Sequence, residues 1–256
     1  MINLHRKLQK IDINQLLTHE KLEQQRLVST YKNIKEEKVI HHPILVVKVL
    51  DHSYMIIDGV HRYYSLRKLG YKNIPCQIVG SDEYKIDSWS HLIEKGVWFD
   101  NLCQQSVFKF DHENKAIKSK FIKLTCGDSF ATRVAFLEGK DVVDECNLMH
   151  EISKTYQEQS FFRVGEKKES YMREGFALVS YPKFTMNEII EYSKNNLLLP
   201  AGVTRFLVQG RLLNLNIPLQ VLNEEECEWE KLIERREGKL RFYSEPVFVC
   251  DTGSKF

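Results

Sequence analysis

The stretch IIDGVHRYYSLRKLG, residues 56–70, gathers anion-binding groups at the point where a strand should meet a helix. The apolar residues before Asp58 predict a buried strand, and the spacing after it switches to a helical period. A helix N-terminus leaves backbone N–H groups without partners and carries partial positive charge. Gly59 would let a ligand approach the backbone closely, and His61 and Arg62 add side-chain donors. Residues Gly59 to Arg62 therefore favour a cradle for nucleotide phosphates.

Asp58 stands at the end of the expected strand, where a carboxylate could hold a magnesium ion that bridges phosphates. The competing interpretation is a plain strand–turn–helix corner, in which Asp58 caps the helix and the side chains of His61 and Arg62 are solvated. On the local pattern alone the two interpretations are equally supported.

Around this corner the sequence predicts a compact α+β domain over residues 1–85. Two β-prone runs that flank a short polar turn predict a β-hairpin. Gly70 is a typical residue to end the helix that follows. The expected elements, in chain order, are a short strand in 10–17, a helix over 22–38, strands over 42–50 and 53–58, a helix over 60–69 and a strand over 74–80.

Residues 86–256 predict a second domain of mixed helices and strands, with ambiguous signals between Phe121 and Tyr171. Thr185 and Glu188 form a T-x-x-E capping box that starts a helix. Residues 197–222 look β-rich, with a turn at Pro-Ala-Gly that leads into a strand at Thr204-Arg205-Phe206. The polar stretch 112–120 is expected to be a surface loop, and the charged stretch 223–238 to be helical.

Composition excludes several classes of function. The chain has 256 residues, of which 43% are hydrophobic and 28% charged, and its formal net charge is +2. This charge is too small to favour nucleic acid by bulk electrostatics. No apolar run is long enough to span a membrane and no secretory signal is visible, so we expect a cytoplasmic protein. The six cysteines are scattered, which predicts reduced thiols rather than a zinc or c-type haem motif.

Residues 8–80 resemble the ParB/sulfiredoxin box, with DGVHR as the core motif. Two branches of that superfamily fit poorly. Sulfiredoxins have a catalytic cysteine directly before the His-Arg pair, and here that position is Val60. Chromosome-partitioning ParB proteins carry a Gly-Glu-Arg-Arg pattern and then a helix-turn-helix, neither of which is readable here.

Over nearly its whole length the sequence resembles the SbnI-type free L-serine kinases of staphylococcal siderophore biosynthesis and, more distantly, archaeal free serine kinases. The motifs that carry the resemblance are LLTHE, HHPILV, YMIIDGVHRYYSL, SWSHLIEKGVWF and PAGVTRF. The resemblance implies phosphorylation of free L-serine to O-phospho-L-serine with ATP and Mg²⁺. That product would supply the 2,3-diaminopropionate of a staphyloferrin B-type siderophore. Because the archaeal relatives use ADP, the residues leave the nucleotide donor open.

The same resemblance implies a role for individual residues. Glu20 is the expected base that accepts the proton of the serine hydroxyl, and Asp58 the expected ligand of magnesium or organiser of the phosphates. Without the resemblance, Glu20 would be an ordinary exposed glutamate. The residues expected to bind the serine are Trp98, Gly202, Val203, Thr204 and Arg205.

Within that group, the guanidinium of Arg205 matches a carboxylate in geometry. The commoner alternative is a surface arginine on a strand. For Trp98, a place in the core is as plausible as a wall of the serine pocket.

Two further hypotheses come from other classes of protein. One is a DNA-binding regulator of siderophore genes, although no helix-turn-helix or basic stripe is readable. The other is a haem-responsive regulator, for which the sequence offers many axial-ligand candidates and selects none. A kinase assay with free serine separates the enzyme from both.

Overall fold

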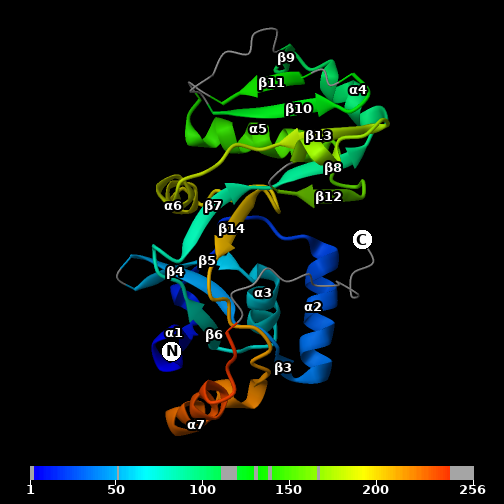
Figure 1. Cartoon of the computed structure of the whole chain (residues 1–256). Helices are drawn as coiled ribbons and strands as arrows, with labels where there is room; N and C mark the ends of the chain where they lie inside the picture. The colour runs from blue at the N-terminus through cyan, green and yellow to red at the C-terminus, as the bar shows by residue number, and fades with distance from the viewer. Residues whose placement is uncertain are drawn as a thin grey trace. The chain divides into compact units, whose positions relative to one another are not determined.

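The computed structural model describes residues 3–50, 52–110, 120–129, 132–137, 140–165 and 168–242. The chain forms two compact units (Figure 1). Unit 1 comprises Met1–Thr18, Leu22–Tyr84 and Val208–Phe256, and unit 2 comprises His19–Lys21 and Lys85–Leu207. Apart from Lys120, the expected surface loop 112–120 lies outside the described residues.

Unit 1 is built on a five-stranded sheet of mixed direction in the order β1-β6-β4-β5-β2. The expected hairpin is confirmed, since β4 and β5 pair antiparallel, while β4 and β6 are parallel. The expected helices around it are also confirmed. The strands are β1 Leu8–Asp12, β2 Leu16–Leu17, β4 Ile44–Leu50, β5 Ser53–Asp58 and β6 Asn73–Ile78, and the helices are α1 Leu4–Lys7, α2 Gln24–Glu37, α3 Val60–Lys68 and α7 Glu226–Glu237.

The expected strand in residues 10–17 is broken in the structure. A 3₁₀ turn, η1 (Ile13–Gln15), separates β1 from β2. The side chain of Asp12 accepts a hydrogen bond of 2.7 Å from the backbone N–H of Asn14. An aspartate that bonds the backbone two residues further on favours a turn over a continuous β-ladder, so this local bond breaks the expected strand.

The C-terminal segment 208–242 belongs to unit 1, whereas the sequence pattern assigned all of 86–256 to a second domain. Its strand β15 (Ile217–Pro218) pairs with β3 (Val39–Ile40), and the turn η3 (Leu219–Leu222) follows. The reason is burial of apolar surface. The segment's apolar side chains join the core of unit 1, namely Leu212, Leu215, Ile217, Leu219, Val221, Leu222, Trp229, Leu232 and Ile233.

Unit 2 contains a six-stranded antiparallel sheet in the order β12-β8-β13-β10-β11-β9. The stretch that was ambiguous from sequence forms part of this sheet and one long helix. The strands are β8 Ser90–Glu94, β9 Lys109–Phe110, β10 Phe121–Cys126, β11 Thr132–Phe136, β12 Phe161–Val164 and β13 Phe176–Ser180, and the helices are α4 Val97–Cys103, α5 Val142–Lys154 and α6 Met186–Lys194, with the 3₁₀ turn η2 Lys168–Tyr171. A separate two-stranded sheet pairs β7 (Tyr84–Ser88) with β14 (Thr204–Val208).

Residues 197–222 contain less strand than expected. Only β14 and β15 form within them. Gly202, Gly210, Asn214 and Asn216 adopt positive φ, which interrupts any longer extended run. The β-rich prediction is therefore correct for Thr204-Arg205-Phe206 and wrong for much of the remainder.

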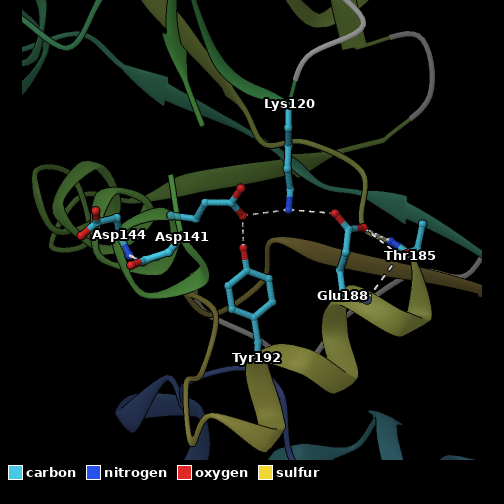
Figure 2. A network of polar contacts seen from close by, with 7 residues as sticks. Lys120, Asp141, Asp144, Thr185, Glu188 and Tyr192 are labelled. Atoms are coloured by element: carbon cyan, nitrogen blue, oxygen red, sulfur yellow. Dashed lines mark hydrogen bonds and ion pairs between the residues drawn. The ribbon is translucent and has the colours of Figure 1, made fainter. Parts of the chain in front are cut away.

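The capping box predicted from Thr185 and Glu188 is present at the start of α6 (Figure 2). Glu188 also forms an ion pair of 3.0 Å with Lys120, whose ammonium lies 3.0 Å from Glu145 on α5 as well. The hydroxyl of Tyr192 donates to the same Glu145 carboxylate. Because Lys120 and Glu145 are largely buried, this network ties α5 and α6 to the segment before β10.

Candidate active site

The DGVHR corner in unit 1 has the strand–turn–helix geometry that the sequence predicts. Strand β5 ends at Asp58, Gly59 has φ of 98°, and α3 begins at Val60. The first bond within the helix runs from the N–H of Tyr63 to the carbonyl of Gly59, over 3.0 Å. The N–H groups of residues 60–62 therefore precede the intrahelical bonding, as anion binding at a helix N-terminus requires.

Arg62 is held rigidly beside the corner. Its Nη1 donates to the backbone carbonyls of His42 and Pro43 over 2.6 and 3.0 Å, and its Nη2 donates to Asp58 over 3.1 Å. A Cβ at Gly59 would lie 2.6 Å from Nη2, so glycine is needed for this close approach as well as for the positive φ. Burial lowers the pKa of Arg62, and the nearby Asp58 carboxylate opposes that shift.

A second guanidinium, which was not predicted from the sequence, also contacts Asp58 at this corner. Arg211 donates to the same Oδ2 atom of Asp58 that accepts from Arg62. Arg211 stands in the segment that returns to unit 1, 153 residues after Asp58. No motif marks Arg211, so only the fold identifies it as part of the corner.

The remaining residues of the motif have separate contacts. The Nε2 atom of His61 accepts a hydrogen bond of 3.3 Å from the backbone N–H of Glu23. Val60 packs against the core of unit 1. The Nδ1 atom of His42 accepts a bond of 3.0 Å from the N–H of Asn214, and burial lowers the pKa of His42, with the positive charge of Arg62 adding to the effect.

Glu20, in unit 2, lies in a cradle made by the PAGVTRF segment. Its Oε2 accepts from the N–H of Gly202 over 2.9 Å, and its Oε1 accepts from the N–H of Thr204 over 2.7 Å. The Thr204 hydroxyl donates to Oε1 too, over 2.5 Å. The Glu20 side chain is only 15% exposed, so it is not an ordinary surface glutamate. These bonds fix the orientation of the carboxylate and leave Oε2 with capacity to accept a further proton.

His19 extends the cradle. Its Nε2 lies 2.8 Å from the Thr204 hydroxyl oxygen, which can accept from His19 while it donates to Glu20. Backbone bonds between His19, Lys21 and Leu199, each 2.8 Å, hold this stretch beside the segment before Gly202. His19 was not singled out from sequence, although it directly precedes Glu20 in the LLTHE motif.

Arg205 leaves β14 on the opposite side from Thr204, because successive strand residues point to opposite faces. Its guanidinium carbon lies 4.4 Å from the centre of the Trp89 ring, and its Nη1 lies 3.8 Å from Asp87. Nη1 is buried and has no hydrogen-bond partner among the described residues. A buried donor of this kind is costly to leave without an acceptor. The Nη1 atom of Arg205 also lies so close to Gly165 that a Cβ at position 165 would clash with it.

The other expected serine-site residues differ in their surroundings. The Trp98 side chain is buried, donates to the Glu94 carbonyl over 2.9 Å and packs edge-on against Tyr156 at 5.5 Å. Val203 is fully buried, so its side chain is part of the core. The N–H of Gly202 is already bonded to Glu20. The structure thus brings Glu20, Gly202 and Thr204 together within unit 2, and the DGVHR residues together within unit 1.

Comparison with known proteins gives the family. The ParB N-terminal domain model matches residues 4–93. The ATP-dependent L-serine kinase SbnI of Staphylococcus aureus is 30% identical over 258 residues, which cover 98% of this chain and all of that protein. The chain belongs to the ATP-dependent L-serine kinase family. A relative from Staphylothermus marinus, also an ATP-dependent L-serine kinase, is 28% identical over 83% of this chain and 90% of its own length.

Solved structures of this kinase family have the same fold. A C-terminally truncated SbnI from Staphylococcus aureus matches with a TM-score of 0.80 and 30% identity, over 93% of this chain and 99% of that one. A free serine kinase in complex with AMP matches with a TM-score of 0.68 and 18% identity, over 84% of this chain and 93% of that one. The α+β assignment, with a ParB/sulfiredoxin-like N-terminal part, is confirmed by these matches together with the family model.

Proposed function

We propose that this chain transfers the γ-phosphoryl group of ATP to the hydroxyl of free L-serine, giving O-phospho-L-serine and ADP. The observation that carries the proposal is the Glu20 cradle, a largely buried carboxylate fixed by Gly202 and Thr204 in a chain of this family. A serine hydroxyl is a weak nucleophile, and a positioned carboxylate that accepts its proton accelerates attack.

In the proposed step, the serine oxygen forms a bond to the γ-phosphorus while the bond between that phosphorus and the β,γ-bridging oxygen breaks. The electron pair of the broken bond leaves with ADP, and the hydroxyl proton passes to Oε2 of Glu20, which carries fewer hydrogen bonds than Oε1. Phosphoryl transfer depends mainly on positioning and charge neutralisation. A carboxylate held by three donors loses little free energy to reorientation during the step.

The N–H groups that open α3, with His61 and Arg62, are proposed to hold the nucleotide phosphates. Rigid donors suit this task because they are oriented before the ligand binds. Arg211 adds a second positive charge to the same corner.

Magnesium would neutralise charge on the phosphates when bound. No group of three or more His, Cys, Asp or Glu side chains suited to a metal occurs in the part of the chain that the structure describes. Magnesium often takes only one or two protein carboxylates together with substrate phosphates, so a single carboxylate fits its chemistry. We propose Asp58 as that carboxylate: its Oδ2 accepts from both Arg62 and Arg211, and among the described residues no guanidinium donates to its Oδ1.

Arg205 is proposed to read the carboxylate of serine, together with Gly202, Val203 and Thr204, which directly precede it in the chain, and with Trp98 as a wall of the serine pocket. The support is its buried Nη1, which has an ion-pair neighbour at 3.8 Å in Asp87 but no hydrogen-bond acceptor among the described residues. An anionic ligand would supply that acceptor.

The decisive experiment detects O-phosphoserine by mass spectrometry after incubation of the chain with serine and Mg²⁺ plus either ATP or ADP. Phosphoserine with ATP supports the proposal, and phosphoserine with ADP alone would assign the other donor. ATP hydrolysis without phosphoserine would refute serine as the acceptor. The same assay tests the kinase proposal against the regulator hypotheses, for which mobility shifts with DNA and a Soret band on haem titration are the separate readouts.

A place in siderophore synthesis is proposed from the relatives. Phosphate is a better leaving group than hydroxide, so O-phosphoserine suits a replacement reaction that makes 2,3-diaminopropionate for a staphyloferrin B-type siderophore. We further propose, from the same relatives, that the reaction takes place in the cytoplasm. The test supplies O-phosphoserine to cells that lack this protein. If these cells still make no siderophore, the proposed role in siderophore synthesis is wrong.

A further inference from the structure

A chain of buried hydrogen bonds runs through unit 2 to the loop that holds Glu20. The hydroxyls of Tyr181 and Tyr156 lie 2.5 Å apart, and the Tyr156 hydroxyl lies 3.0 Å from Nδ1 of His91. Nε2 of His91 lies 2.9 Å from the carbonyl oxygen of Gly202. The three side chains are each no more than 3% exposed. This series of hydrogen bonds therefore links the interior of unit 2 to Gly202, whose N–H donates to Glu20.

The direction of these bonds follows from their last member. A carbonyl oxygen can only accept, so Nε2 of His91 carries the proton that bonds Gly202. In a neutral ring Nδ1 then accepts from Tyr156, whose oxygen accepts in turn from Tyr181. Burial raises the pKa of both tyrosines, so both hydroxyls keep their protons as donors.

The ring of His91 is also fixed in orientation. It stacks on Phe161 with ring centres 4.3 Å apart and an angle of 29° between planes. Gly202 is held from both sides, since its carbonyl accepts from His91 while its N–H donates to Glu20 over 2.9 Å. Its φ of 71° and the close approach of Arg163 both exclude a larger residue there. A shift of the Gly202 peptide would move a donor of the Glu20 carboxylate.

We propose that His91 is a positioning residue for the kinase reaction, which holds the Gly202 peptide through Nε2 and thereby fixes the Glu20 carboxylate, while Tyr156 and Tyr181 supply the hydrogen bond that Nδ1 accepts in this tautomer. The inference rests on the proposed role of Glu20 as the base. His91 touches neither substrate in this proposal, because its two ring nitrogens are engaged by Tyr156 and Gly202.

The test is a double-mutant cycle measured as kcat at saturating serine and ATP. His91→Phe removes the donor and should lower kcat by about tenfold, the scale of one lost hydrogen bond. His91→Gln places an amide donor near the position of Nε2 and should recover part of that loss. In a Glu20→Gln background, His91→Phe should lower kcat by less than about twofold, because the carboxylate that it positions is gone.

Two tyrosine variants control for loss of packing. Tyr181→Phe removes the first donor of the chain and should lower kcat severalfold. Tyr192→Phe removes a hydroxyl that is equally buried but bonds Glu145 in the network of Figure 2, so it should lower Tm and leave kcat unchanged. These variants keep the test valid if His91→Phe does not fold.

Equal losses of kcat from His91→Phe in the two backgrounds would overturn the inference, as would equal effects of the two tyrosine variants. Failure of the proposed function looks different, since the unmodified chain would then make no phosphoserine. In that case the same cycle is read in unfolding free energy. Additive losses for His91→Phe and Glu20→Gln would overturn the coupling between the two residues, and non-additive losses would support it.

Discussion

Replacing Glu20 by glutamine removes the proposed base while changing the size of the side chain little. The carboxylate accepts one donor on Oε2 and two on Oε1. An amide can keep its oxygen toward the two Thr204 donors, but its NH₂ group then faces the N–H of Gly202. One buried donor is left unsatisfied, which costs about 1–3 kcal/mol of stability.

The substitution should lower kcat by more than the loss of folding free energy would explain. Loss of a general base typically costs about 10²–10⁴-fold in rate, which corresponds to roughly 3–5 kcal/mol in the barrier. We expect kcat for phosphoserine formation to drop by at least about a hundredfold. Glu20→Asp keeps the carboxylate but is one methylene shorter, so it should be intermediate.

The assay measures phosphoserine formation by rapid quench at saturating ATP and serine, with nucleotide affinity from calorimetry and Tm from thermal unfolding. Glu36→Gln is a matched control, because the Glu36 side chain on α2 is 63% exposed and forms only a long ion pair of 4.0 Å with Lys32 among the described residues. That control should leave kcat and Tm unchanged. Near-normal turnover of Glu20→Gln, in a folded protein that binds nucleotide, would remove Glu20 from the mechanism.

Other substitutions test the remaining parts of the site. Arg62→Ala and Arg211→Ala should each weaken ATP binding by roughly tenfold or more, because each removes a charged donor from the Asp58 corner; unchanged dissociation constants would refute the phosphate cradle. Arg205→Ala should raise KM for serine about ten- to a hundredfold without changing ATP affinity. Ethanolamine, which lacks the carboxylate, should be a very poor substrate of the unmodified chain, and efficient ethanolamine phosphorylation would refute the role of Arg205. Thr185→Ala removes the cap of α6 and should cost about 1 kcal/mol of stability by chemical denaturation, with kcat unaffected.

Features that depend on neighbours along the chain could be predicted from the sequence. The apolar run before Asp58, the glycine after it and the helical period that follows predict the corner of unit 1, and the structure has this corner, with Gly59 at positive φ. The T-x-x-E pattern at Thr185 likewise predicts the start of α6. Turns, caps and periods are local, because the interacting groups lie within a few residues of each other.

Contacts that join distant segments could not be predicted in this way, because they form only when the chain folds. Residues 208–242 return to unit 1 because their apolar side chains complete its core, and this return brings Arg211 to Asp58. The cradle of Glu20 joins residues 182 and 184 positions apart. His91 lies in the SWSHLIEKGVWF motif, but nothing in that motif predicts its bond to Gly202, which is 111 residues away in the sequence. Such pairings are fixed by the burial of non-local surface and the satisfaction of buried polar groups, neither of which a short stretch of sequence contains.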